Sequence, residues 1–153
     1  MNIKIRGNQS PLVRSLQAGD YSLKLVVVDM PHNHSIYGTT RKLAKAISVG
    51  EEGVPARPFM KQFFSENRSF IMECVNTHIK LNKDIKVALE KAGWEINTRF
   101  AEWVMGGGVK PENTVHTIRK KGHDIVLVGS LTHPDHLIYA VQPVVQLRDK
   151  RKR

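Results

Sequence analysis

Paired histidines are the first residues of this sequence that could do chemistry. The run His32-Asn33-His34 places two imidazoles two residues apart, which invites a metal-dependent nuclease interpretation. Nuclease sites of that kind spread their ligands over two strands and a helix, so a contiguous tripeptide does not supply one. The two rings could share a metal ion only if other ligands converged on them. The sequence therefore predicts solvated loop histidines here.

Further histidines and two aspartates lie later in the chain, at His123, Asp124, His133, Asp135 and His136. They could add ligands or form acid–base pairs, but no carboxylate or cysteine stands at a recognisable metal spacing. No nucleophile stands at a known position beside them either. We therefore predict no metal, no cofactor and no catalytic residue, and the chain is not expected to be an enzyme.

A glycine run and a single cysteine complete the chemical candidates. Gly106-Gly107-Gly108 precedes Lys110, but a phosphate loop follows a strand and opens a helix, whereas these glycines follow a helical pattern. They predict a helix end. Cys74 lies among apolar residues of a predicted helix, with no adjacent base, and is expected to be an inert core thiol. A lone cysteine also excludes an internal disulfide.

The composition favours acidic partners. The 153 residues carry a formal charge of +10, with 24 Lys and Arg against 14 Asp and Glu. Such a balance suits nucleic acid, an acidic protein surface or anionic lipid without choosing among them. No apolar run approaches the ~20 residues that span a bilayer, so no membrane partner is expected. The basic clusters lack a zinc knuckle, helix-turn-helix spacing or stacking aromatics, which leaves phosphate attraction without base readout.

One long helical pattern organises the chain. Apolar residues recur at steps of three and four between 82 and 108, the spacing of one helix face. Asn82 is expected to cap this helix, and the three glycines to end it. The stripe consists of Ile85, Leu89, Ala92, Ile96, Phe100 and Trp103. A second long helix is predicted over 58–80, joined to the first by a tight connection and antiparallel to it.

The remaining patterns predict strands and short helices. Strands are expected at 3–5, 21–28, 125–128 and 137–147, with 21–28 interior to a sheet and Pro143 at an edge or bulge. Loops are expected at 7–20 and 31–35, and short helices at 40–47 and 113–121. The predicted fold is α+β, a small mostly antiparallel sheet packed against two long antiparallel helices. We expect one domain, 1–147, and a flexible basic tail, 148–153.

The segment Val54-Pro55-Ala56-Arg57-Pro58-Phe59-Met60 leads into the first long helix. It resembles the (I/V)PARPF(M/L) signature of phage tail-completion and neck proteins, the minor tail or virion-morphogenesis proteins of long-tailed phages. Thr117-Ile118-Arg119-Lys120-Lys121-Gly122 is similar to the family's T-I-x-x-K-G stretch. Gly129-Ser130-Leu131 stands where the family has D-T-G-x-L, with Leu127 and Val128 in place of its aspartate and threonine. The resemblance covers roughly residues 23–131.

This resemblance implies a structural virion protein of the head–tail junction, a tail-completion, tail-terminator or neck subunit. It implies a homo-oligomeric ring, a hexamer or a dodecamer, closed through heterologous interfaces. The neighbours would be tail-tube and head-connector proteins, with the basic residues facing their acidic surfaces or the phage DNA. The chain would lie in the virion, and in the host cytoplasm during assembly. The alternative is a small basic, non-enzymatic nucleic-acid-binding protein.

The signature and the later basic clusters supply the candidate interface residues. Its prolines stiffen an extended arm, Arg57 offers a planar fork for a carboxylate, and Phe59 offers an apolar anchor. Phe59 could equally close the core over the helix pair, because the two roles look alike in a sequence. The candidate subunit or partner interface comprises Pro55, Arg57, Pro58, Phe59, Arg119, Lys120, Lys121, Arg148, Lys150 and Arg151.

Overall fold

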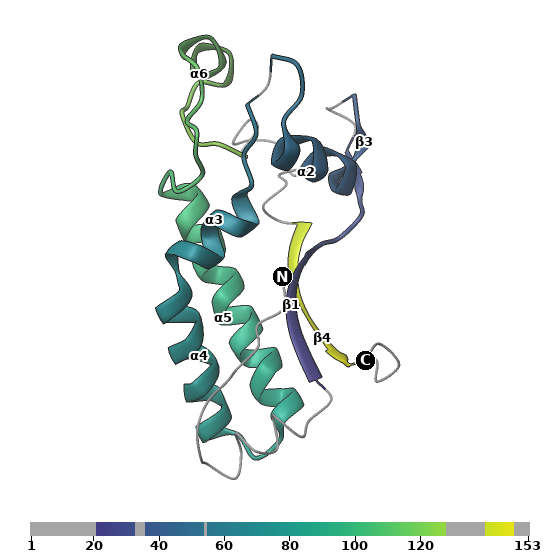
Figure 1. Cartoon of the computed structure of the whole chain (residues 1–153), viewed down its shortest axis with the longest axis vertical. Helices are drawn as coiled ribbons and strands as arrows, with labels where there is room; N and C mark the ends of the chain where they lie inside the picture. The colour runs from purple at the N-terminus through teal and green to yellow at the C-terminus, as the bar shows by residue number, and fades with distance from the viewer. Residues whose placement is uncertain (1–20, 33–35, 54, 128–139, 149–153) are drawn as a thin grey trace. The chain divides into compact units, whose positions relative to one another are not determined.

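The computed structural model describes residues 21–32, 36–53, 55–127 and 140–148, and it has an α+β fold (Figure 1). The predicted strand at 3–5 and the predicted loop at 7–20 lie outside the described residues. The elements are β1 Tyr21–Val27, β2 Pro31–His32, β3 Gly38–Thr39, α2 Thr40–Val49, α3 Phe59–Glu66, α4 Arg68–Leu81, α5 Ile85–Met105, α6 Val115–Lys121 and β4 Val141–Leu147. None of the helices in these ranges has the length and apolar character needed to cross a membrane.

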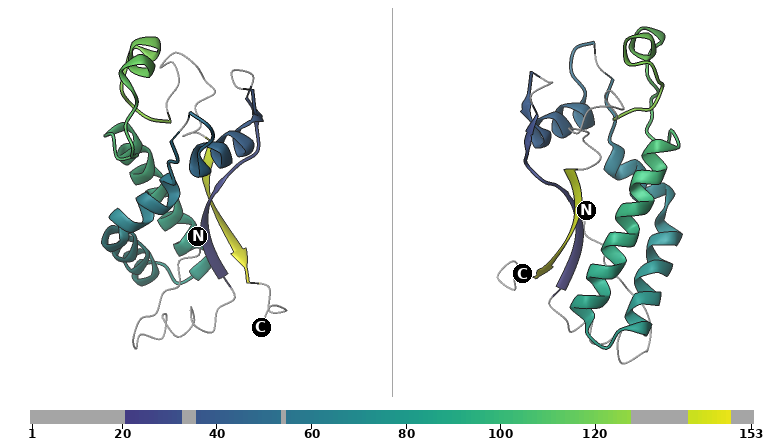
Figure 2. Two further views of the ribbon diagram at one scale, coloured as in Figure 1. Left: turned by 45° about the horizontal axis from the view of Figure 1, so that its top comes forward. Right: turned by 180° about the vertical axis from the view of Figure 1, so that it is seen from behind.

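The chain divides into two compact units. The first comprises residues 1–25, 67–98 and 143–153, and the second comprises 26–66 and 99–142. In the first unit, α4 and the beginning of α5 lie side by side and run in opposite directions (Figure 2). Their facing sides are buried, as the apolar spacing predicts. The buried residues are Ile71, Cys74, Val75, Ile79, Ala88, Leu89, Ala92 and Ile96.

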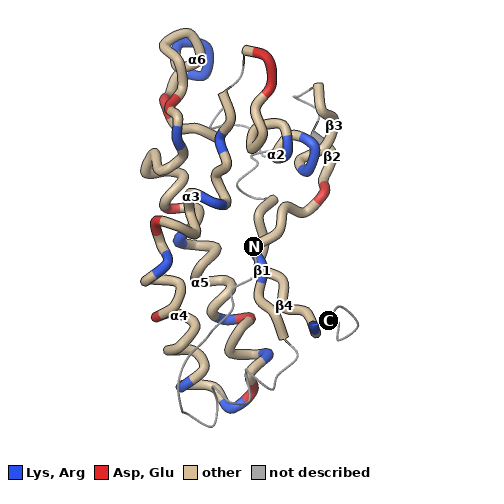
Figure 3. The backbone as a smooth tube through the Cα atoms, in the orientation of Figure 1, with Lys and Arg blue, Asp and Glu red and all other residues tan. Residues whose placement is uncertain are grey.

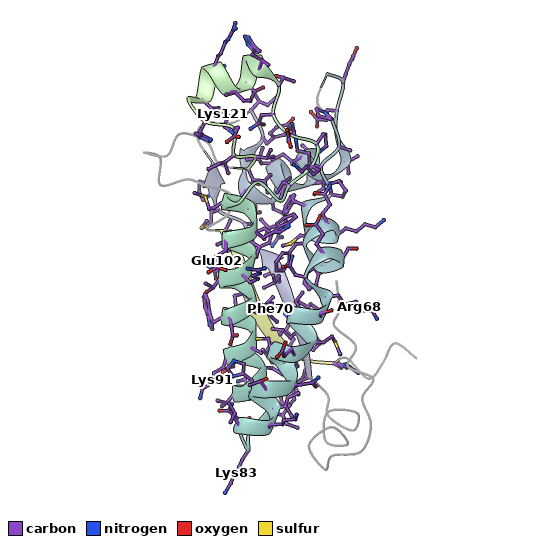
Figure 4. All side chains as sticks on the ribbon, turned by 90° about the vertical axis from the view of Figure 1, so that its left-hand side faces the viewer. Arg68, Phe70, Lys83, Lys91, Glu102 and Lys121 are labelled. Atoms are coloured by element: carbon purple, nitrogen blue, oxygen red, sulfur yellow. The ribbon has the colours of Figure 1, made fainter. Side chains whose placement is uncertain are left out.

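The residues that cap α4 and α5 differ from those predicted. Asp84, not Asn82, begins α5, because its Oδ1 accepts from the main-chain N–H of Lys86 at 2.8 Å and of Val87 at 3.2 Å. These are donors that the first turn of a helix leaves without partners. Asn82 ends α4 instead, donating from its side chain to the carbonyl of His78 at 2.8 Å. Lys83, between them, projects away from the helices (Figure 4).

The strands β1 and β4 form a two-stranded antiparallel sheet. Val28 N donates to Ala140 O at 2.7 Å, and Lys24 Nζ reaches Gln146 Oε1 at 3.5 Å, so residue numbers rise along one strand as they fall along the other. Pro143 lies within β4, where it removes one main-chain donor. Among the described residues β1 has β4 as its one neighbour, so the prediction that β1 is interior to a sheet is not met there.

Gly93 of α5 lets this part of the sheet approach the helix. A Cβ placed on Gly93 would lie 2.7 Å from Pro143 Cβ and 2.8 Å from Leu23 Cδ1. Real Cβ atoms do not approach neighbours that closely. A residue other than glycine at position 93 would therefore push the strands away from α5. The predicted packing of strands against a long helix is therefore present. It depends on Gly93, whose role the apolar spacing of the helix does not reveal.

We expect Gly93→Ala to lower the free energy of unfolding by about 1 kcal/mol, measured by urea denaturation. Overpacking of this kind costs about 1–3 kcal/mol, and it outweighs the better helix propensity of alanine, about 1 kcal/mol. Thr98→Ala, at an exposed position of the same helix, should leave stability unchanged or slightly raised. A Gly93→Ala protein as stable as the original would mean that the strands do not lie this close.

The second unit is built around an aromatic cluster from α3 and the end of α5. Phe63, fully buried, lies 5.2 Å from Phe100 and 5.6 Å from Trp103, measured between ring centroids. Phe59 lies 6.2 Å from Phe100. Trp103 satisfies its indole N–H by donating to Glu66 Oε2 at 2.7 Å. The rings meet at tilted or edge-on angles, the arrangements that aromatic pairs prefer.

The predicted helix over 58–80 is wrong in its length, because the chain forms two helices, α3 and α4. Asn67 leaves helical geometry at φ −106° and ψ 19°, and its carbonyl then accepts from Ile71 N to start α4. The apolar pattern conceals this break. Phe64 and Ile71 are two full turns apart, and the stripe positions between them hold the polar Asn67 and Arg68, so the spacing does not require a continuous helix.

Smaller elements of the second unit also adjust the predictions. The start of the predicted loop 31–35 is a short strand, β2, which pairs antiparallel with β3, Pro31 opposite Thr39 and His32 opposite Gly38. Thr39 caps α2 and Thr114 caps α6, each accepting a main-chain N–H three residues later. The predicted strand at 125–128 is wrong over 125–127, since residues 126–127 form a turn with Leu127 at φ +67° and Ile125 is in no strand. Of the predicted strand 137–147, residues 137–139 lie outside the described ranges.

Candidate functional site

The signature segment forms an internal clasp in the second unit. Arg57 donates from Nε to Pro111 O at 2.8 Å and from Nη2 to Glu112 O at 3.1 Å. Gln62, on α3, donates to Lys110 O at 2.7 Å and accepts from Lys110 N at 3.1 Å. We call Arg57 and Gln62, with the main chain of 110–112 that they hold, the arginine clasp.

The position of Arg57 in the clasp follows from its neighbours in sequence. Prolines at 55 and 58 keep the main chain extended before α3, because a residue before proline is biased away from helical geometry. Arg57 N donates to Ile47 O at 2.8 Å, which fixes the segment to the end of α2. The planar guanidinium then donates to two successive carbonyls, because its N–H groups are held in a fixed, forked arrangement. The clasp therefore joins α2, α3 and the segment after α5.

Three basic side chains, those of Arg57, Lys110 and Lys121, belong to the clasp or lie beside it. Burial lowers the pKa of Arg57, although a guanidinium stays protonated in proteins. Burial, followed by the charge of Arg57, lowers the pKa of Lys121, whose Nζ donates to Ile125 O at 2.8 Å. Hydrogen bonding to Lys110 lowers the pKa of Glu112, whose main chain belongs to the clasp. Arg57 itself bonds carbonyl oxygens, not a carboxylate.

The predicted interface residues fall into two groups. Arg57 and Phe59 are buried, at 9% and 1% exposure, and Lys121 is half-buried, so these three serve the fold of their own unit. For Phe59 this is the core-closing role, the second of the two that its sequence context allows. Pro55 is exposed and Pro58 half-buried at the start of α3.

The exposed candidates carry positive charge. Arg119 and Lys120 end α6 with their side chains in solvent, and the blue segments of Figure 3 show this basic end and a second one at the start of α2. Cations at a helix C-terminus are stabilised by the helix dipole. Arg148 is exposed after β4, and Lys150 and Arg151 lie outside the described residues. Arg119, Lys120 and Arg148 are thus the described members that could meet a partner.

Only some of the catalytic candidates lie among the described residues. Residues 33–35 and 128–139, which include His34, His133, Asp135 and His136, lie outside them, as does the side chain of His32. The glycine run ends α5, and a Cβ on Gly108 would lie 2.2 Å from the Trp103 ring, so this glycine serves packing. Cys74 is 5% exposed, and burial, aided by Glu95, raises the pKa of its thiol to about 12. Such a thiol is a poor nucleophile.

Two features of the first unit are not anticipated by the sequence reasoning. Trp94 is 57% exposed on α5, although large aromatic residues usually bury most of their surface. Its position off the apolar stripe is the signal that could have identified it. Cys74, His78 and Glu95 gather between α4 and α5. The spacing Cys-x-x-x-His on a helix hints at this group, but Glu95 joins it only through the pairing of the helices.

Comparison of the chain with protein-family models, curated proteins and solved structures finds no match to any of the three.

Proposed function

We propose that the chain is a non-enzymatic structural protein of a long-tailed phage, a ring-forming subunit that completes or terminates the tail or joins it to the head. The observation that carries the proposal is the signature at 54–60 together with the later stretches in the same order. A subunit of this kind acts through its shape and its contacts with neighbours. It needs a rigid frame and exposed contact residues, and no reacting groups.

The arginine clasp supports this proposal by giving the signature a structural purpose. Arg57 ties three segments of the second unit through Ile47, Pro111 and Glu112, and Phe59 fills its aromatic core. A motif of two prolines, an arginine and a phenylalanine is thereby accounted for as a means of fixing a loop to a helix.

The contact residues would be the exposed ones. Trp94 offers a large aromatic surface, and aromatic side chains dominate the binding energy of many interfaces. Arg119 and Lys120 offer positive charge, which suits an acidic neighbour and speeds association. A ring closes when one surface of a subunit meets a different surface of the next. Trp94 and the basic end of α6 provide two such unlike contact groups.

The test is a mass measurement of the purified protein, alone and mixed with the tail-tube protein of the same phage. We expect a species near six or twelve times 17.3 kDa, formed alone or on the tube protein. A chain that stays a monomer under both conditions would contradict the proposal.

We expect the double variant Arg119→Glu/Lys120→Glu to reduce the ring fraction at least tenfold at physiological salt. Reversing two charges at an interface costs several kcal/mol when like charges are brought together. The matched control is Arg41→Glu/Lys42→Glu, the same charge change at exposed positions of α2. Equal loss in both variants would indicate a general effect of net charge and would remove α6 from the interface.

The exposed basic ends of α2 and α6 favour nucleic-acid binding as a second candidate function. When a protein contacts only the phosphates, its binding affinity falls steeply as the salt concentration rises and does not depend on the nucleotide sequence. Fluorescence anisotropy with random duplexes between 50 and 200 mM salt would measure this slope. Strong salt-dependent binding by a monomer that is absent from virions would favour this function over the ring.

A further inference from the structure

Three side chains with different ligand chemistries meet between α4 and α5 in the first unit. Cys74 and His78 are one turn apart and so lie on the same face of α4. Glu95 extends from α5 toward them. Cys74 Sγ, one ring nitrogen of His78 and one carboxylate oxygen of Glu95 all lie within 4.8 Å of one another. His78 Nε2 is 2.7 Å from Glu95 Oε2.

We propose that Cys74, His78 and Glu95 form a zinc site that links α4 to α5. Thiolate, imidazole and carboxylate are the three ligand types that Zn²⁺ takes in proteins. Their usual bond lengths, about 2.0–2.3 Å, set the ligand atoms of a tetrahedral site roughly 3.3–3.7 Å apart. The nitrogen and oxygen of the His78–Glu95 pair would have to separate by less than about 1 Å to admit the ion. Side-chain rotation provides this without moving the helices.

The surroundings suit a divalent ion at the edge of the core. Cys74 is buried, the His78 side chain is 19% exposed and the Glu95 side chain is 51% exposed, so the group runs from the core to solvent. Zinc can enter from the Glu95 side, and water can take the fourth position there. On binding, the Cys74 thiol gives up its proton to solvent. One thiolate and one carboxylate then balance the two charges of the ion.

A metal at this place would cross-link the helix pair. Residues 74 and 95 lie on different helices, on either side of the turn at 82–84, so the ion would hold the pair together independently of its apolar contacts. An ion that binds the folded chain and not the unfolded one raises stability by mass action. At free zinc about 100 times the dissociation constant, we expect Tm to rise by about 5–10 °C.

The competing interpretation is an ordinary His78–Glu95 ion pair beside a core thiol. Titration of the metal-free full chain with Co²⁺ under a thiol-free reductant separates the two. A zinc-type site should give one Co²⁺ per chain, visible bands of tetrahedral intensity, a thiolate-to-cobalt charge-transfer band, and loss of all of them on adding Zn²⁺. Binding without the thiolate band, or binding at no defined stoichiometry, would overturn the proposal.

Variants make the assignment specific. Glu95→Gln and His78→Gln should each weaken Co²⁺ binding at least tenfold, and Cys74→Ser should also remove the charge-transfer band. Glu95→Gln is the safest of these for folding, because its side chain is half in solvent. His116→Gln, on exposed α6, is the matched control and should bind as the original does. Unchanged affinity in Glu95→Gln and His78→Gln would overturn the site, whatever the ring assembly does.

Discussion

Phe63→Ala is expected to lower the free energy of unfolding by about 4 kcal/mol, the largest effect of any single substitution considered for this chain. Phe63 is fully buried, and its ring touches those of Phe64, Phe100 and Trp103. Removing it costs the transfer free energy of the ring and leaves a cavity that rigid aromatic neighbours cannot fill. Urea denaturation followed by circular dichroism measures the change.

Lys61→Ala provides the control for Phe63, because it truncates an exposed side chain on the same helix. Its effect should stay within about 0.5 kcal/mol. The loss in free energy of unfolding for Phe63→Leu should lie between those of Lys61→Ala and Phe63→Ala, since leucine refills part of the cavity. If Phe63→Ala cost less than about 1 kcal/mol, the aromatic cluster would not be the core of the second unit.

Arg57→Met is expected to lower the free energy of unfolding by about 3 kcal/mol. The variant keeps an unbranched apolar stem but loses both donors to Pro111 and Glu112, and hydrogen bonds to charged groups are worth about 1.5–3 kcal/mol each. We expect the loss of stability to lie near the low end of the sum for two bonds. Pro111 and Glu112 are exposed, so water can replace the lost donors at their carbonyls. Hydrogen exchange should also show the 110–112 segment opening more often.

Arg57→Lys tests whether the geometry of the fork or its charge matters. An ammonium reaches one carbonyl where the guanidinium reaches two, so we expect roughly half the loss seen for methionine. Arg41→Met removes an exposed guanidinium and should change stability by less than about 0.5 kcal/mol. A full rescue by lysine would mean that the clasp acts through charge alone.

The parts of the fold that follow from local periodicity were predictable. The stripe through Leu89, Ile96 and Phe100 marks α5 because residues three and four apart must share a helix face. The break at Asn67 was hidden, since two turns separate Phe64 from Ile71 and either a helix or a turn satisfies that spacing. Asn82 and Asp84 both make good caps, and the choice depends on where α4 ends, which tertiary packing decides.

The candidate sites were less predictable, because each depends on contacts between distant segments. Arg57 was recognised as a planar donor fork, but a sequence does not show that carbonyls 54 and 55 residues away would use it. Cys74 and His78 are visible at helical spacing, yet Glu95 reaches them only once the helices pair. Exposed charge at Arg119 and Lys120 was the easiest to predict, since it follows from composition and helix position alone.

The chain is proposed to build part of a phage particle. Electron cryomicroscopy of intact particles from a phage that encodes the chain tests this proposal most directly. We predict a closed ring of copies at the junction of head and tail, with α6 and Trp94 at contacts between neighbouring subunits. Particles that are complete and infectious without this chain, or that contain no copy of it at the junction, would contradict the account.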